Sequence, residues 1–272
     1  MRYALTVQYR GKCYAGSQIQ FQNGKQIAEP TIQGELEKAL STLIFGDTEN
    51  KNRQFKTVFS GRTDKGVNSQ GQVVHFDTDK DIVASKFVYQ LNEILPEDIS
   101  VSNLKIVDKS FHAQKSAIRR HYRFEFINRK CKGAFDGDLM RVKYEVSIAR
   151  MQKALNYLLG EHDFSSFKSS GTLNPSKICF IEIAKVQKQG DKVIIDIEGN
   201  RFLYNMVRTI VGTLLEIEGH NLPPEHMKDV LEAKDRRRAG QTVSPYGLTL
   251  MKVEYKQVGI AVPARINGEN AI

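Results

Sequence analysis

The segment GRTDKGVNSQGQVVHF, Gly61–Phe76, contains an arginine and an aspartate whose spacing could support catalysis. Arg62 and Asp64 lie two residues apart in a tight turn with a glycine on either side, and glycine lets the backbone take turn conformations that project the intervening side chains. A carboxylate in such a position can act as a nucleophile. The alternating residues Gln72–Phe76 predict a strand that anchors the turn. The alternative is a turn whose charged side chains are merely solvated.

Two other side chains are candidates because of the elements that carry them. Arg208 lies in the middle of an otherwise apolar helical pattern, where a charge needs a partner unless it emerges on the solvent face of the helix. Tyr122 alternates with Arg120 and Phe124 along a predicted strand, so the three side chains share one face. By spacing alone, Tyr122 is either a core residue or a ring on which a base can stack.

The elements that must position these residues follow from hydrophobic periodicity and turn signals. Strands are predicted over Tyr3–Tyr9, Thr57–Gly61, Gln72–Asp77, Ile99–Val107, His121–Asn128, Ile181–Gln187, Lys192–Glu198 and Leu248–Tyr255. Helices are predicted over Thr31–Phe45, Ser85–Leu95, Ser147–Leu159, Arg201–Ile217 and Pro224–Ala233. Helices mixed with antiparallel hairpins indicate an α+β fold, with helices covering one side of the sheets. We expect two similar mixed α/β halves, residues 1–115 and 116–260, followed by a mobile tail, residues 261–272.

Composition limits the class of protein. The chain has 272 residues, of which 40% are apolar and 26% charged, and a chain of this length can bury roughly three quarters of its unfolded surface. No apolar run approaches the ~20 residues of a membrane span. The first residues, MRYALTVQYRG, alternate like a strand and lack the apolar core of a signal peptide. We therefore expect a cytoplasmic protein with no membrane partner.

The charge balance favours a polyanionic partner. Lys and Arg outnumber Asp and Glu by 40 to 31, a net charge of +9, which promotes nucleic-acid binding through counterion release. Arginines also cluster at Arg119, Arg120 and Arg123 and again at Arg236–Arg238, although such runs are often only solvated faces. The three cysteines are far apart and the six histidines show no paired ligand spacing. We predict neither a metal nor a cofactor.

The segment around Asp64 resembles the signature of the tRNA pseudouridine synthase A family, usually GRTDxGVHAxxQVxHF. Further segments resemble the family's patterns in the same order along the chain. They are an opening pattern from Tyr9 to Leu40, the strand RHYRF at Arg120–Phe124, the segments GEHDFSSF at Gly160–Phe167 and FLYNMVRTIVG at Phe202–Gly212, and a closing pattern from Ala239 to Leu250. Ordered matches over nearly the whole chain make chance similarity a poor explanation.

This resemblance implies a pseudouridine synthase fold, in which the two halves, with antiparallel sheets, form a central basic cleft. It implies that Asp64 is the nucleophile, that Arg208 pairs with it, and that Tyr122 stacks on the flipped uracil. It further implies that Arg62 enters the RNA stem where the base has left. Because Arg208 would favour the charged form of Asp64, we expect that carboxylate to be ionised at neutral pH despite partial burial.

The resemblance also implies a substrate, further contacts and an assembly. The substrate would be tRNA, modified at positions 38, 39 and 40 of the anticodon stem-loop by a homodimer. Leu248 matches the apolar residue that lines the family's site, although it could equally be a core leucine. The remaining substrate-binding candidates belong to one segment, in which Gln114 replaces the family's usual arginine: Phe111, His112, Ala113, Gln114 and Lys115.

The chain departs from the family pattern away from the chemical centre. Asn68 and Ser69 replace the usual His-Ala, Ser17 lies where Trp is common, and the strand at Cys179–Ile181 lacks the arginine that usually precedes it. We expect these changes to lie on the RNA-recognition rim. Two alternatives therefore stay open: a synthase of the same fold that acts on another RNA or tRNA position, and a catalytically silent RNA-binding protein.

Overall fold

A computed structural model describes residues 1–22, 25–26, 28–46, 55–170 and 176–256. The predicted mobile tail, residues 261–272, lies outside the described residues. The helices are α1 (Ile32–Phe45), α2 (Ala84–Ile94), α3 (Ile148–Asn156), α4 (Met206–Gly219) and α5 (His226–Ala233). The strands are β1 (Arg2–Tyr9), β2 (Phe21–Gln22), β3 (Lys25–Gln26), β4 (Val58–Phe59), β5 (Asn68–Asp77), β6 (Ile99–Val107), β7 (Ala117–Asn128), β8 (Arg141–Val142), β9 (Gly160–Asp163), β10 (Ile178–Gln189), β11 (Lys192–Gly199) and β12 (Leu248–Tyr255). None of the described helices is long and apolar enough to cross a membrane.

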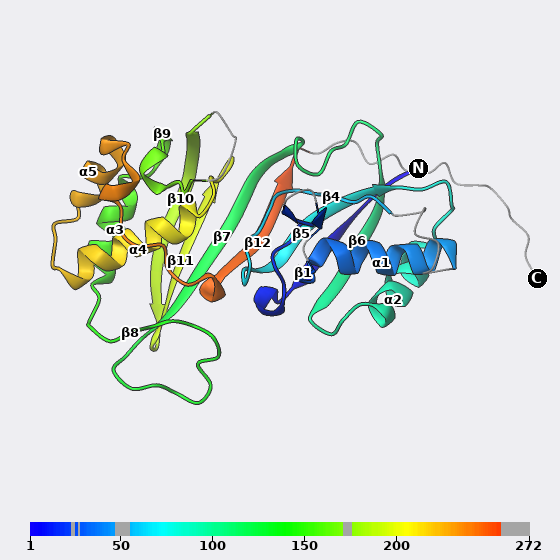
Figure 1. Ribbon diagram of the computed structural model, residues 1–272. Helices are drawn as coiled ribbons and strands as arrows, with labels where there is room; N and C mark the ends of the chain where they lie inside the picture. The colour runs from blue at the N-terminus through cyan, green and yellow to red at the C-terminus, as the bar shows by residue number, and fades with distance from the viewer. Residues whose placement is uncertain (23–24, 27, 47–54, 171–175, 257–272) are drawn as a thin grey trace, which may run out of the picture.

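The predicted α+β fold is confirmed, and its two halves share one ten-stranded sheet. The main strand order is β6-β1-β5-β12-β7-β11-β10-β9. Neighbouring strands are antiparallel within each half, apart from the short β8, whereas β12 pairs with β5 in parallel at Leu250 and Ser69. Figure 1 shows α1 and α2 at one end of this sheet and α3 to α5 at the other, with β7 and β12 between them. The last of the described strands, β12, therefore joins the two halves.

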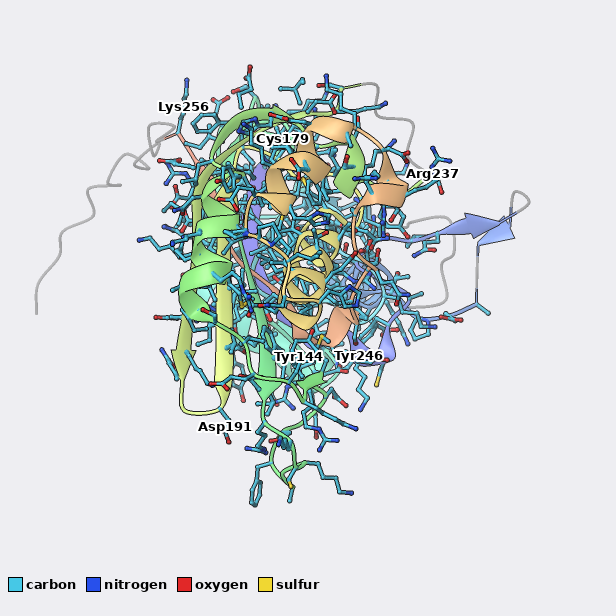
Figure 2. The ribbon with its side chains drawn as sticks, turned by 90° about the vertical axis from the view of Figure 1, so that its left-hand side faces the viewer. Tyr144, Cys179, Asp191, Arg237, Tyr246 and Lys256 are labelled. Carbon is cyan, nitrogen blue, oxygen red and sulfur yellow. The ribbon has the colours of Figure 1, made fainter. Side chains whose placement is uncertain are left out.

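Each end of the sheet has its own hydrophobic core. Tyr3, Leu5 and Val7 of β1 pack with the buried side chains of α1 and α2, while Phe124 and Phe126 of β7 pack with those of α3 to α5. Figure 2 shows how far the hairpin of β10 and β11 extends along the second half, from Cys179 near one end to Asp191 at the turn. A division near residue 115 remains a prediction, because the sheet itself is continuous.

Helix boundaries follow local capping chemistry. The predicted start of α1 is confirmed, because the side chain of Thr31 accepts a hydrogen bond from Gly34 N at 3.1 Å and Gly46 ends the helix with φ +73°. The predicted start of α4 at Arg201 is wrong by five residues. Asn205 adopts φ +61°, a left-handed conformation that a helix interior does not allow, so α4 begins at Met206.

Pairing with β12 lengthens two strands beyond their predicted ends. β5 begins at Asn68 rather than Gln72, and β7 begins at Ala117 rather than His121, where it faces Tyr255. The short strands β2, β3, β8 and β9 were not predicted. They contain two to four residues each, too few to show a hydrophobic period.

Candidate active site

Asp64 lies in a tight loop between β4 and β5, Gly61–Val67, which we call the Asp64 loop. Val67 N donates to Asp64 O at 3.1 Å, which closes a turn around the aspartate. Gly66 adopts φ +84° within that turn, a conformation that favours glycine, and its N–H donates to Gly11 O at 3.2 Å. The predicted turn is therefore present, and it is tied to the segment that follows β1.

Three buried polar side chains brace the Asp64 loop. The hydroxyl of Ser17 accepts from Thr63 N at 2.8 Å, and the hydroxyls of Tyr9 and Thr63 are 2.8 Å apart. Gln72 of β5 donates to Gly61 O at 3.0 Å. Because these groups have lost their water, each bond would be costly to leave unmade. Sequence reasoning assigned no such role to Tyr9 or Ser17, although both lie within the family motifs, whereas Gln72 begins the segment that was expected to anchor the turn.

The Asp64 carboxylate contacts Arg208 across the junction of the two halves. Arg208 Nη1 lies 3.4 Å from Asp64 Oδ2, and the two side chains are 15% and 25% exposed, the arginine being the more buried. Burial raises the pKa of Asp64 above its ordinary value, and the Arg208 guanidinium opposes that rise. Burial is the larger effect, whereas sequence reasoning gave more weight to the arginine. The second oxygen, Oδ1, has no hydrogen-bond partner among the described residues.

Arg208 is held in place by groups of its own half. Its Nε donates to Val243 O at 2.8 Å and its Nη1 donates to the side-chain oxygen of Asn205 at 2.8 Å. The same left-handed Asn205 that delays the start of α4 therefore orients the arginine. The need for a partner, expected from the sequence, is met by Asp64 and by these two acceptors rather than by solvent.

Tyr122 lies near the carboxylate and on the face of β7 that carries the core. Its ring meets Phe202 edge to face, with centroids 5.1 Å apart. Burial raises its pKa, and the nearby Tyr9 and Asp64 raise it further, so the hydroxyl stays protonated at neutral pH. Leu248 begins β12 opposite Phe124 and is buried. It is thus a residue of the hydrophobic core, and its predicted contact with the substrate remains a prediction.

The other predicted substrate-binding residues, Arg62 and the segment Phe111–Lys115, differ in how exposed their side chains are. Arg62 is exposed, and its Nε donates to Gln18 Oε1 at 2.5 Å. In the segment Phe111–Lys115, Phe111 and Ala113 are buried in a small cluster with Ala4, and the His112 ring accepts from the backbone of its own turn. Only the side chains of Gln114 and Lys115 are exposed there.

The expectation that the departures from the family pattern lie on a recognition rim is wrong for several of them. Ser17 is fully buried. Ser69 is also buried, and its hydroxyl accepts from Gln72 N at 2.9 Å. Asn68 accepts from Gly11 N at 3.0 Å. The side chains of Ser17, Asn68 and Ser69 stabilise the Asp64 loop and its neighbouring strand, whereas Gln114 is exposed.

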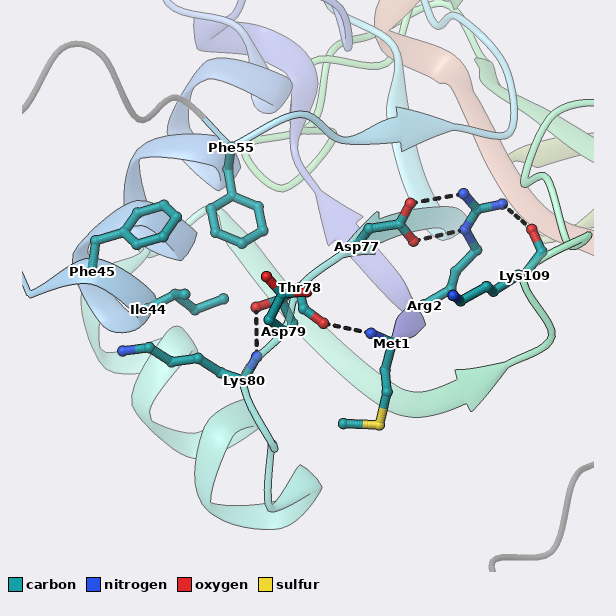
Figure 3. A pocket seen from close by; sticks show the side chains of 10 residues that line it. All are labelled: Met1, Arg2, Ile44, Phe45, Phe55, Asp77, Thr78, Asp79, Lys80 and Lys109. Atoms are coloured by element: carbon teal, nitrogen blue, oxygen red, sulfur yellow. Dashed lines mark hydrogen bonds and ion pairs between the residues drawn. The ribbon is translucent and has the colours of Figure 1, made fainter.

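A separate pocket of about 580 Å³ lies between β1, β5 and the end of α1, and its lining includes none of Asp64, Arg208 and Tyr122. Figure 3 shows that Arg2 and Asp77 in this pocket are paired with each other, Arg2 donating twice to Asp77 at 2.8 Å. Among the described residues, no three His, Cys, Asp or Glu side chains converge in a way that could hold a metal ion.

Comparison with known proteins identifies the family of this chain. A family model described as tRNA pseudouridine synthase matches residues 154–256, and a model for uncharacterised proteins conserved in bacteria matches residues 52–198. The tRNA pseudouridine synthase A of Bacillus subtilis (strain 168) is 40% identical over 256 residues, which cover 94% of this chain and 99% of that protein. The protein of that name in Colwellia psychrerythraea is 38% identical over 258 residues, which cover 94% and 95%.

Among solved structures, a Cbf5-Nop10-Gar1 complex aligns with a TM-score of 0.35 at 10% identity, over 78% of this chain and 53% of that one. Sequence identity to the two tRNA pseudouridine synthases A is much higher, 38% and 40% over 94% of this chain. The chain therefore belongs to the tRNA pseudouridine synthase A family, a family of isomerases.

Proposed function

We propose that the protein converts uridine to pseudouridine at positions 38, 39 and 40 of the tRNA anticodon stem-loop, with Asp64 as the nucleophile. The observation that carries the proposal is the contact between Asp64 Oδ2 and Arg208 Nη1 at 3.4 Å in a part-buried site. A carboxylate that is partly desolvated but paired with a fixed cation is both reactive and ionisable.

The reaction rearranges the uridine without a net change in composition. The bond between uracil N1 and the ribose breaks, the uracil turns, and its C5 forms a bond to the same ribose carbon. The C5 hydrogen leaves as a proton and N1 gains one. Asp64 Oδ1 is the oxygen available to attack, at the ribose or at the uracil ring, while Arg208 stabilises the ionised form through Oδ2.

A base inside a stem must leave its stack before Asp64 can reach it, which costs a few kcal/mol. We assign the receiving surface to the ring of Tyr122, since base stacking on an aromatic ring contributes about 1–3 kcal/mol. Leu248 lies at the edge of that surface. Arg62, exposed on the Asp64 loop, would fill the vacated position in the stem.

The exposed end of the Phe111–Lys115 segment is a further candidate RNA contact. We place Gln114 and Lys115 against the RNA, because their side chains are exposed, while Phe111, His112 and Ala113 shape the loop that presents them. We also propose that the protein is cytoplasmic and forms a homodimer. Sedimentation equilibrium tests the dimer directly.

Substrate and position are tested by mapping pseudouridine in RNA from a strain that lacks this protein. We expect the modification at positions 38 to 40 to disappear and to return with wild-type protein but not with Asp64→Ala. Loss of pseudouridine elsewhere, with positions 38 to 40 intact, would instead support a synthase that acts on another RNA. Asn68 and Ser69 do not favour that alternative, because the side chain of each accepts a hydrogen bond from the protein backbone, from Gly11 N and from Gln72 N.

A further inference from the structure

We propose that Arg120 is a positioning residue that joins the segment leading to Asp64 to the segment leading to Arg208. The inference rests on the proposed function and extends it to a residue that touches neither partner of the catalytic pair. Arg120 lies on β7 two residues before Tyr122 and points to the same face.

Arg120 donates four hydrogen bonds to backbone carbonyls of separate segments. Its Nη1 donates to Asn200 O at 2.7 Å and to Ala117 O at 3.1 Å, and its Nη2 donates to Ser60 O at 3.2 Å and to Gln114 O at 3.0 Å. Ser60 belongs to the first half of the molecule and Asn200 to the second. One guanidinium therefore spans the junction in which the active site lies.

The two ends of this bridge lead directly to the catalytic pair. Ser60 immediately precedes the Asp64 loop and is fixed to β5 by its N–H, which donates to Val73 O at 2.8 Å. Asn200 begins the segment that connects β11 to α4. This segment ends at Asn205, the residue whose side chain orients Arg208. Phe202, which contacts the Tyr122 ring, lies in the same segment. A change in the separation of Ser60 and Asn200 must move these groups relative to one another.

The surroundings of Arg120 are unusual for a surface arginine. The charged or titratable groups that act on it are Tyr122, Tyr255 and Arg201, and burial lowers its pKa. Within the described residues no carboxylate forms an ion pair with it. Its charge is balanced by carbonyl dipoles, and only the planar guanidinium fork reaches four of them at once. Lysine cannot reproduce that geometry.

The neighbouring Arg119 offers a matched control. It points to the opposite face of β7 and forms ion pairs with Glu182, Glu198 and Glu254. It is the same residue type on the same strand, but these glutamates belong to neither catalytic segment. If Arg120 merely supported the sheet, changes at the two positions would have similar effects.

The test compares Arg120→Gln and Arg120→Lys with Arg119→Gln in three measurements: thermal unfolding, the kinetics of tritium release from uracil-C5-labelled tRNA, and the titration of the Asp64 carboxyl by ¹³C NMR without substrate. A displacement of about 1 Å can reduce kcat by about a hundredfold. We expect both Arg120 variants to lose about 10- to 100-fold in kcat with KM within about threefold. We also expect the Asp64 titration to move to higher pH as Arg208 recedes.

Arg119→Gln should leave kcat and the Asp64 titration unchanged. The proposal is overturned if the Arg120 variants match Arg119→Gln, or if kcat falls only in proportion to lost folded protein while Asp64 titrates as in the wild type. Should Arg120→Gln fail to fold, Arg120→Lys decides the matter. A wild-type protein that releases no tritium would refute the proposed function, whereas the NMR titration would still decide the role of Arg120.

Discussion

At the scale of single residues, the site depends on a balance at Asp64. Burial disfavours the ionised carboxylate, and Arg208 at 3.4 Å favours it. The raised pKa matters for the proposed attack, because the ionised carboxylate is a far stronger nucleophile than the protonated acid. A fully hydrated aspartate would be ionised more easily but would also be shielded by water, which makes it a weaker nucleophile.

The raised pKa of Asp64 predicts where activity is lost in acid. An ordinary aspartate has a pKa of about 3.9. The proposed reaction requires ionised Asp64, and burial raises the pKa of that carboxyl. We therefore expect the acid limb of kcat/KM to lie at higher pH than the ordinary value. Arg208→Gln should move this limb further up by removing the cation that lowers the pKa, and Arg208→Lys should move it less. A limb at or below the ordinary value in the wild type would contradict this account.

The ring of Tyr122 should matter more than its hydroxyl. Because burial keeps the hydroxyl protonated, we expect Tyr122→Phe to lose less kcat/KM than Tyr122→Leu, which removes the stacking surface and its ~1–3 kcal/mol. The two variants can be compared directly in the tritium-release assay. Equal losses would show that the hydroxyl, rather than the ring, is the functional part.

Sequence motifs identified three residues that the fold brings together, and their catalytic roles remain predictions. Asp64, Arg208 and Tyr122 all belong to such motifs, and in the folded chain they lie together. The bracing roles of Tyr9 and Ser17 could not be predicted, because their partner Thr63 lies tens of residues away and sequence spacing carries no signal for such contacts.

At the scale of elements, the Asp64 loop is fixed by a close approach between backbones. A Cβ on Gly11 would lie 2.1 Å from Val67 O. We therefore expect Gly11→Ala to destabilise the fold by about 1–3 kcal/mol, the usual cost of overpacking, and to lower kcat by displacing the loop. Urea unfolding and the tritium-release assay measure the two effects.

Gly61 supplies the control for that substitution. A Cβ there meets nothing within 4 Å, so Gly61→Ala should leave the free energy of unfolding within about 0.5 kcal/mol of the wild type. If both variants were equally stable, the loop could move away from Gly11 at little cost, and the proposed rigidity would be wrong.

Most elements could be predicted because their periods and caps are local. Thr31 and Gly46 mark α1 correctly. Asn205 shows the limit of this reasoning, since an apolar helical pattern continues through it while its left-handed backbone excludes it from α4. The side chain of Asn205 bonds to Arg208 and Ser169, and the contact with Ser169 is a tertiary one that no local pattern shows.

At the scale of the whole molecule, the shared sheet explains how two halves build one site. β12 lies between β5 and β7, so the strand that follows the Asp64 loop and the strand that carries Tyr122 are held one strand apart. The α+β class was predictable from the order of elements. The insertion of β12 between the halves was not, because it pairs residues as distant in sequence as Ser69 and Leu250.

The net charge of +9 predicts strong salt dependence of tRNA binding. If about five phosphates are contacted, the slope of log K against log salt concentration is about −4. Asp64→Ala should weaken affinity by no more than about tenfold, or ~1.4 kcal/mol, and should keep the same slope because the phosphate contacts remain. Affinity that stays constant between low and moderate salt would argue against a phosphate-binding surface.

We propose above all that Asp64 performs the chemistry while the rest of the site binds and positions the base. The most direct test is tritium release from uracil-C5-labelled tRNA by purified wild-type protein and by Asp64→Ala, with tRNA binding measured in parallel. We predict release by the wild type, no detectable release by the variant, and retained binding by both. An Asp64→Ala protein that releases tritium at the wild-type rate would contradict the claim.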